Sequence, residues 1–161
     1  MFTATSPDQM PDLETMLSMS GLDFMQAMRD GKISRPPISA LMNYTLDTVE
    51  VGKVAFRGVP EFQHTNPAGG VHGGWYGTLL DSCMSCAVMT VTPKGSVYTT
   101  LEYKVNLTGA IPLGTEIIAT GTIDHAGRST GVAHGEIRDA NSDRLYATGS
   151  ATCLIMQRHK D

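Results

Sequence analysis

The chain has few cysteines, no long apolar run and no excess of positive charge, and each shortage excludes a class of protein. Its 161 residues include three cysteines, an odd number that fits a reducing cytosol better than a disulfide framework. No stretch approaches the roughly 20 apolar residues of a membrane-spanning helix, and the polar first ten residues do not resemble a secretory signal. The net charge of −4 argues against nucleic acid binding. We therefore expect a cytoplasmic protein that binds neither membrane nor nucleic acid.

Several catalytic and cofactor motifs are also missing. The sequence contains no G-x-S-x-G nucleophile elbow, no P-loop and no dinucleotide fingerprint. Cys83 and Cys86 have the spacing of a redox or metal pair, but no second pair completes a zinc site. Packing of two small side chains inside a helix is the favoured interpretation. We expect an activity that needs neither a metal nor an organic cofactor.

The pattern of apolar residues predicts helices first and then strands around one long helix. Apolar residues recur at three- and four-residue steps over residues 11–30, which predicts two short helices, and Arg35-Pro36-Pro37 is expected to end this helical region. Small and apolar residues without proline predict a long buried helix over 75–91. Alternating or apolar runs predict strands over 42–50, 53–59, 97–107, 115–123, 130–138 and 145–156.

This order of elements predicts an α+β fold in which an antiparallel sheet surrounds one long central helix. We assign residues 1–41 to an N-terminal helical extension and residues 42–161 to the main domain. A single helix cannot cover both faces of such a sheet, so we expect a homo-oligomer.

Two glycines stand directly before the long helix and a carboxylate follows two turns later. The first N–H groups of a helix lack internal partners and carry positive potential, so they can bind an oxyanion. Gly73 and Gly74 would let a substrate carbonyl approach this backbone closely. Gly74, Thr78, Asp81 and Ser85 share one side of the helix. Because Asp81 lies in an apolar segment, it must be paired, hydrogen-bonded or exposed in a cleft.

The stretch with Asn66, then His72-Gly73-Gly74, then Asp81 nine residues after the histidine resembles the phenylacetate-degradation-type (PaaI-like) hotdog thioesterases. The resemblance covers roughly residues 42–156. It implies a hotdog fold and an acyl-CoA thioesterase, with Asp81 as general base or nucleophile and the Gly73 N–H as donor to the oxyanion. Asn66 would position the attacked carbonyl or the water.

The resemblance also implies roles for further side chains. Ser85 and Thr100 match positions where a hydroxyl lies beside the carboxylate, with Thr99 as the weaker substitute for Thr100. His72 is expected first to support the loop by hydrogen bonding, and second to transfer a proton. Family sites form across a dimer interface, with the carboxylate of one subunit facing the asparagine and glycine of the other, and we expect a dimer of dimers.

Substrate contacts are expected from Gly74, from Trp75 beside the acyl group and from Arg128 with the CoA phosphates. An arginine that the family often has after the strand ending at Leu107 is missing, since Thr108 follows instead. The acyl group itself is left open between an aryl group and a medium aliphatic chain.

Two other functions compete with hydrolysis. A hotdog hydratase or dehydratase would carry a different arrangement of histidine and acid, with prolines around the start of the helix. A non-catalytic acyl-CoA-binding protein would not need the carboxylate of Asp81 beside an anionic ligand.

Overall fold

The computed structural model describes residues 2–157, so the last four residues of the expected domain 42–161 lie outside it. The elements follow in the order η1 (Pro7–Gln9), α1 (Leu13–Ser18), α2 (Gly21–Arg29), α3 (Pro37–Leu41), β1 (Tyr44–Glu50), β2 (Lys53–Gly58), η2 (Phe62–His64), α4 (Gly73–Met89), β3 (Ser96–Leu107), β4 (Ile117–Ala126), β5 (Thr130–Asp139) and β6 (Leu145–Gln157).

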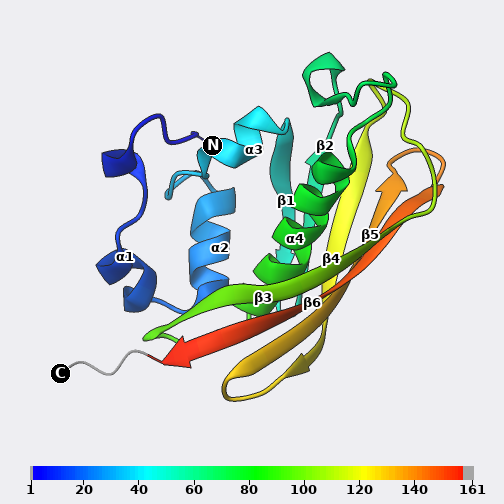
Figure 1. Ribbon diagram of the computed structural model, residues 1–161. Coiled ribbons are helices and arrows are strands. Elements are labelled where there is room, and N and C mark those ends of the chain that lie inside the picture. The colour runs from blue at the N-terminus through cyan, green and yellow to red at the C-terminus, as the bar shows by residue number, and fades with distance from the viewer. Residues whose placement is uncertain (1, 158–161) are drawn as a thin grey trace.

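One antiparallel sheet contains all six strands, in the order β1-β2-β4-β5-β6-β3. The sheet curves around α4, and the short helices of the N-terminal segment lie beside α4 (Figure 1). The predicted hotdog arrangement is thereby confirmed, and the predicted strands and long helix begin and end within three residues of those observed.

The long helix lies directly against the sheet. Its residues Leu79, Leu80, Cys83 and Val88 are fully buried. Glycine in β4 permits this close approach, because a Cβ at Gly121 would lie 2.2 Å from the carbonyl oxygen of Cys83. The position of α4, which carries most of the expected site, is therefore fixed by backbone contact with the sheet.

The N-terminal segment shares this core. The N-cap Ser20 accepts a hydrogen bond from the Asp23 N–H and starts α2, whose Phe24 and Met25 are 5% and 2% exposed. The expectation that Pro36-Pro37 ends the helical region was wrong, because α3 begins at Pro37. Proline fits the first turn of a helix, where its missing N–H has no intrahelical partner. The division at residues 41 and 42 stays a prediction.

One edge of the sheet carries exposed apolar side chains. β3 pairs only with β6 among residues 2–157, and a bulge between Thr100 and Glu102 interrupts its register. Leu101, Tyr103 and Leu107 are 57%, 47% and 53% exposed. An uncovered edge strand with an apolar face is a surface that a second chain can cover, so self-association remains our expectation.

Candidate active site

His72 organises the start of α4. It is the N-cap residue, and its Nδ1 atom accepts a hydrogen bond of 2.8 Å from the Gly74 N–H. The backbone N–H of His72 donates a hydrogen bond of 2.8 Å to the carbonyl oxygen of His64. A Cβ at position 74 would lie 2.9 Å from Nδ1 of His72, so a side chain there would displace the imidazole ring from this cap. These contacts agree with the supporting role expected first for His72, and they engage the N–H of Gly74.

Unlike the backbone N–H of Gly74, the backbone N–H of the neighbouring Gly73 is not engaged by any described residue. No residue within 2–157 accepts a hydrogen bond from the Gly73 N–H, and Gly73 itself is exposed at the positive end of α4. Such a group can donate to an anionic oxygen. The geometry is compatible with the predicted oxyanion donor, which stays a prediction.

Asn66 closes the loop before the helix. Its side-chain Oδ1 atom accepts hydrogen bonds from the backbone N–H groups of Ala68 at 2.9 Å and Gly70 at 3.2 Å. The backbone N–H of Asn66 donates to the Gly70 carbonyl oxygen at 2.8 Å. Within one chain, neither Asn66 nor Gly73 lines the pocket that contains Asp81. The structure of a single chain therefore does not assemble the expected constellation.

Asp81 lies on α4, half-buried, and is held by one side chain from β3. The hydroxyl of Thr100 donates a hydrogen bond of 3.0 Å to Oδ1 of Asp81. Burial raises the pKa of Asp81 above its ordinary value, and the hydrogen bond from Thr100 opposes this rise. Thr99 is exposed. Thr100, and not Thr99, therefore lies beside the carboxylate, and its role in catalysis stays a prediction. The raised pKa makes Asp81 a better proton acceptor than an ordinary aspartate.

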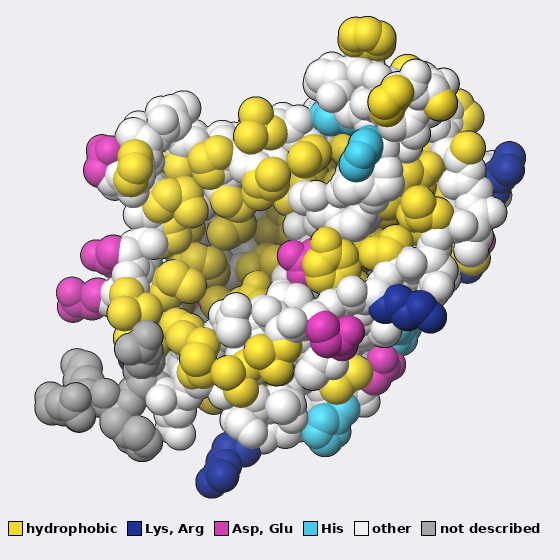
Figure 2. Space-filling view, viewed as in Figure 1, with side chains coloured by type: hydrophobic (Ala, Val, Ile, Leu, Met, Phe, Trp, Pro, Cys, Tyr) yellow, Lys and Arg dark blue, Asp and Glu magenta, His cyan; other side chains and the backbone are white. Residues whose placement is uncertain are grey.

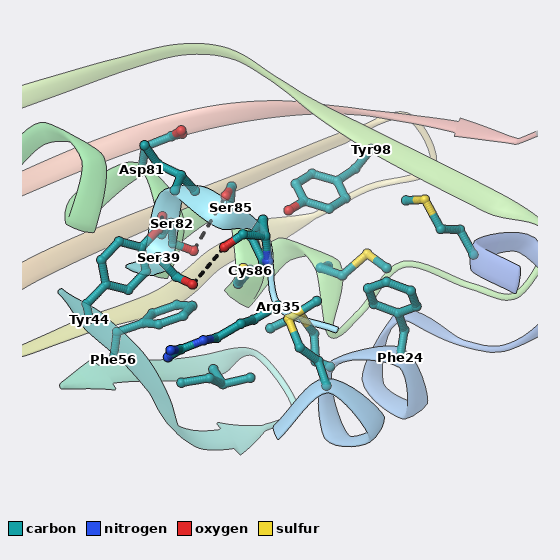
Figure 3. Close-up of a pocket in the computed structure, with 17 residues that line it drawn as sticks. Phe24, Arg35, Ser39, Tyr44, Phe56, Asp81, Ser82, Ser85, Cys86 and Tyr98 are labelled. Carbon is teal, nitrogen blue, oxygen red and sulfur yellow. Dashed lines mark hydrogen bonds between the residues drawn. The ribbon is translucent and has the colours of Figure 1, made fainter. Parts of the chain in front are cut away.

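An apolar pocket of about 240 Å³ opens beside Asp81. Figure 2 shows a hollow lined by hydrophobic side chains between the N-terminal helices, α4 and β3. The close-up in Figure 3 shows aromatic side chains from separate helices and strands around it, with Phe24, Phe56 and Tyr98 among them. A pocket of this kind accepts an apolar group and leaves a carboxylate at its edge.

Polar groups of the pocket were only partly predicted. Ser85 is buried and lines the pocket, but its hydroxyl donates a long hydrogen bond of 3.5 Å to the Ser82 carbonyl oxygen. The hydroxyls of Tyr44 and Ser82, which lie 2.9 Å apart on β1 and α4, were not predicted from the sequence. No motif joins residues that are so far apart in the sequence.

Trp75 and Gly74 lie in a second pocket. This cleft of about 370 Å³ is also lined by His72 and Thr78. Trp75 is 2% exposed and its indole N–H donates to the Met42 carbonyl oxygen at 2.9 Å. The predicted stripe on α4 therefore connects two pockets, with Gly74 and Thr78 in one and Asp81 and Ser85 in the other. Contact of Trp75 with a substrate stays a prediction.

Three further candidates are Arg128 and the two cysteines of α4, Cys83 and Cys86. Arg128 is exposed in the turn between β4 and β5 and forms no ion pair with any described residue. Burial raises the pKa of the Cys86 thiol to about 12, and burial also raises the pKa of the Cys83 thiol above its ordinary value. Among residues 2–157, no three histidine, cysteine or acidic side chains are grouped to hold a metal, and no helix is both long and apolar enough to cross a bilayer.

Comparisons with known proteins point to one family. The model of the thioesterase superfamily matches residues 68–146, from the loop before α4 to the start of β6. Mouse acyl-coenzyme A thioesterase 13 is 30% identical over 92 residues, which make up 57% of this chain and 65% of the mouse protein. This chain thus spans about two thirds of the length of that relative.

Solved structures share the fold. A phenylacetic acid degradation-related protein of Ralstonia eutropha superposes with a TM-score of 0.74 at 22% identity, covering 81% of this chain and 98% of that one. A Streptococcus mutans protein bound to acetyl-CoA superposes with a TM-score of 0.65 at 23% identity, covering 73% of this chain and 92% of that one. At these identities the likeness establishes the hotdog fold.

Proposed function

Because the chain is a hotdog protein of the thioesterase superfamily, we propose that it hydrolyses the thioester bond of an acyl-coenzyme A. The observation that carries this proposal is the half-buried Asp81, with its raised pKa, at the edge of an apolar pocket. The pocket suits the acyl group, and the carboxylate suits activation of the attacking water. The name of the mouse relative supports CoA as the thiol.

In the proposed mechanism Asp81 acts as a general base. It takes a proton from a water molecule whose oxygen attacks the thioester carbonyl carbon. The negative charge that develops on the carbonyl oxygen is stabilised by the Gly73 N–H of a partner subunit. The carbon–sulfur bond then breaks, the thiolate of CoA leaves and takes up a proton, and the free acid is released. A thioester is already activated, so polarisation of its carbonyl and one base are sufficient.

The first test is Asp81→Asn, which keeps the shape of the side chain and removes its charge. Loss of a general base costs about 10²–10⁴-fold, so kcat with the best acyl-CoA ester should fall at least about a hundredfold. Free thiol release measures the rate. Asp143→Asn, an exposed aspartate in the turn between β5 and β6, is the matched control and should keep full activity.

Stability distinguishes loss of chemistry from loss of fold. The pKa of Asp81 is raised in the folded state, so its contribution to stability is complete below the unfolded pKa and is lost as pH rises through the folded pKa. At neutral pH the uncharged asparagine should therefore unfold at a temperature no lower than wild type. A folded Asp81→Asn protein that hydrolyses its best ester at the wild-type rate would contradict the mechanism.

Base and nucleophile roles differ in the origin of the product oxygen. In a single turnover in heavy-oxygen water, a general base places a solvent oxygen in the product acid. A nucleophilic Asp81 would form an anhydride with the acyl group. If water then attacks the aspartyl carbonyl, the first product acid keeps an unlabelled oxygen from the Asp81 carboxylate. Labelled acid in the first turnover is the expected result.

A further inference from the structure

The pocket beside Asp81 is built by two separate parts of the chain. Nearly half of the residues that line it belong to the N-terminal segment, with Phe24, Met25 and Met28 of α2 among them. The match to the thioesterase superfamily begins at residue 68. One wall of the pocket therefore comes from residues that lie outside the matched region.

This wall is held firmly against the rest of the molecule. The Gly21 N–H donates to the Thr92 carbonyl oxygen at 3.0 Å, and a Cβ at Gly21 would lie 1.8 Å from the carbonyl oxygen of Met89. The start of α2 thus lies in backbone contact with the end of α4. A second tie, from the Gly95 N–H to the Leu17 carbonyl oxygen at 3.1 Å, holds α1. The helices form a fixed wall with a defined shape.

The wall lies where the end of an acyl group must be. Figure 3 shows Asp81 at one end of the pocket and Phe24 toward the other. The thioester carbonyl has to lie beside Asp81 for water to be activated there, so the acyl group extends toward α2. Apart from Asp81 and Arg35, whose Nε donates to the hydroxyl of Thr3, the lining side chains are uncharged. The distance from the carbonyl to α2 limits the length of the acyl group.

We infer that α2 is a specificity element of this enzyme, and that Phe24 and Met28 set the longest acyl group that the pocket accepts. The inference rests on the proposed thioesterase function. Because α2 belongs to a segment outside the matched region, acyl preference and catalytic chemistry reside in different parts of the chain. The substrates are CoA esters of apolar acyl groups whose ends lie against the side chains of α2.

Opposite substitutions at one position test this inference. Phe24→Leu enlarges the far end of the pocket and Phe24→Trp fills it. The kcat/KM values are measured for butanoyl-, hexanoyl-, octanoyl-, decanoyl- and dodecanoyl-CoA. One methylene in a fitted apolar pocket is worth about 10–200-fold in kcat/KM. The ratio of long to short esters should rise at least about tenfold for Phe24→Leu and fall for Phe24→Trp.

Two more variants control for effects on folding. Met28→Ala, at a partly buried position on the same wall, should shift preference toward longer esters even if a Phe24 variant does not fold. Met19→Ala removes a partly buried methionine of the same segment that does not line the pocket, and should keep the wild-type profile. A shift with Met19→Ala equal to that with Met28→Ala, or unchanged profiles throughout, would overturn the inference.

Binding separates this inference from the proposed function. The same esters are titrated into Asp81→Asn and into its combinations with Phe24→Leu and Met28→Ala. Wild-type protein that hydrolyses none of the esters removes the thioesterase proposal, while a shift of the tightest ester to longer chains still supports the role of α2. Identical binding profiles in all three proteins would overturn the role of α2 in acyl preference.

Discussion

At the scale of single residues, the proposed site depends on one carboxylate, and two features of its surroundings shift its pKa in opposite directions. Burial makes the charged form of Asp81 less favourable, whereas the hydroxyl of Thr100 stabilises it through a 3.0 Å hydrogen bond. A general base has to be ionised to act, so activity should fall as pH decreases through the pKa of Asp81. The acid limb of the rate profile is therefore expected above the ordinary aspartate pKa of about 3.9.

Thr100→Val tests this balance. Valine keeps the shape and removes the hydrogen bond that lowers the pKa of Asp81, so the acid limb of kcat/KM should move to higher pH. A pH profile of hydrolysis with the best ester measures the shift. Thr99→Val changes an exposed neighbour in the same strand and should leave the limb in place. Movement of the limb to lower pH in Thr100→Val would show that Asp81 is not the titrating base.

The Cys86 thiol lies in the same pocket and should not take part in catalysis. With a pKa of about 12, only roughly one thiol in ten thousand is ionised at about pH 8. Iodoacetamide at about pH 8 should therefore leave activity intact over times that fully alkylate free glutathione. Cys86→Ala should keep turnover within a few-fold of wild type. Rapid inactivation of wild type, absent in Cys86→Ala, would reveal a reactive thiol.

Residue patterns indicated some of these candidate residues, whose chemical roles stay predictions. The loop, the glycines and Asp81 follow each other closely in the sequence, so their relation was visible there. The hydroxyls of Tyr44 and Ser82 are brought within 2.9 Å by the packing of β1 against α4, and no spacing rule connects them. Phe24 of α2 and Phe56 of β2 are likewise brought to the pocket by tertiary packing, which no sequence spacing reveals.

At the scale of secondary structure, periodicity predicted the strands and the long helix well because each has one dominant pattern. α3 was missed because its two prolines suggested an end, although Pro37 occupies the first turn. The alternation in β3 predicted a strand correctly, but a bulge between Thr100 and Glu102 interrupts its register, and Leu101 and Tyr103 are exposed in the single chain. Alternation reveals which side chains share a face, but it does not reveal which chain covers that face.

Contact between α4 and β4 should be a sensitive point of the fold. In Gly121→Ala the new methyl group would meet the backbone of Cys83 at 2.2 Å, and backbone cannot move aside as a flexible side chain can. Overpacking of this kind costs about 1–3 kcal/mol, so Tm should fall by several degrees in a calorimetric scan. Gly70→Ala, whose Cβ would have its nearest neighbour at 3.7 Å, is the control and should unfold near the wild-type temperature. Equal Tm values for both variants would contradict the close approach.

At the scale of the whole molecule, the proposed site is incomplete in one chain. Asp81 lines the apolar pocket, whereas Asn66 and Gly73 do not. The exposed apolar side chains of β3 offer a surface for a second copy. A partner subunit that brings its loop toward Asp81 would complete the arrangement in both directions, because a two-fold interface repeats each contact.

Subunit complementation tests this shared site. Asp81→Asn and Asn66→Ala chains, carrying different affinity tags, are co-expressed, and the mixed dimer is isolated by two successive affinity steps. If each site takes Asp81 from one chain and Asn66 from the other, the mixed dimer contains one intact site and one doubly altered site. Its activity should be about half that of wild type, since two-fold symmetry gives two equal sites, although each variant alone is nearly inactive.

A mixed dimer of two differently tagged Asp81→Asn chains is the control and should stay inactive. Activity of the mixed dimer no higher than the mean of its two parents would mean that each chain carries a site of its own, and a fully active monomer in light scattering would exclude the shared site directly.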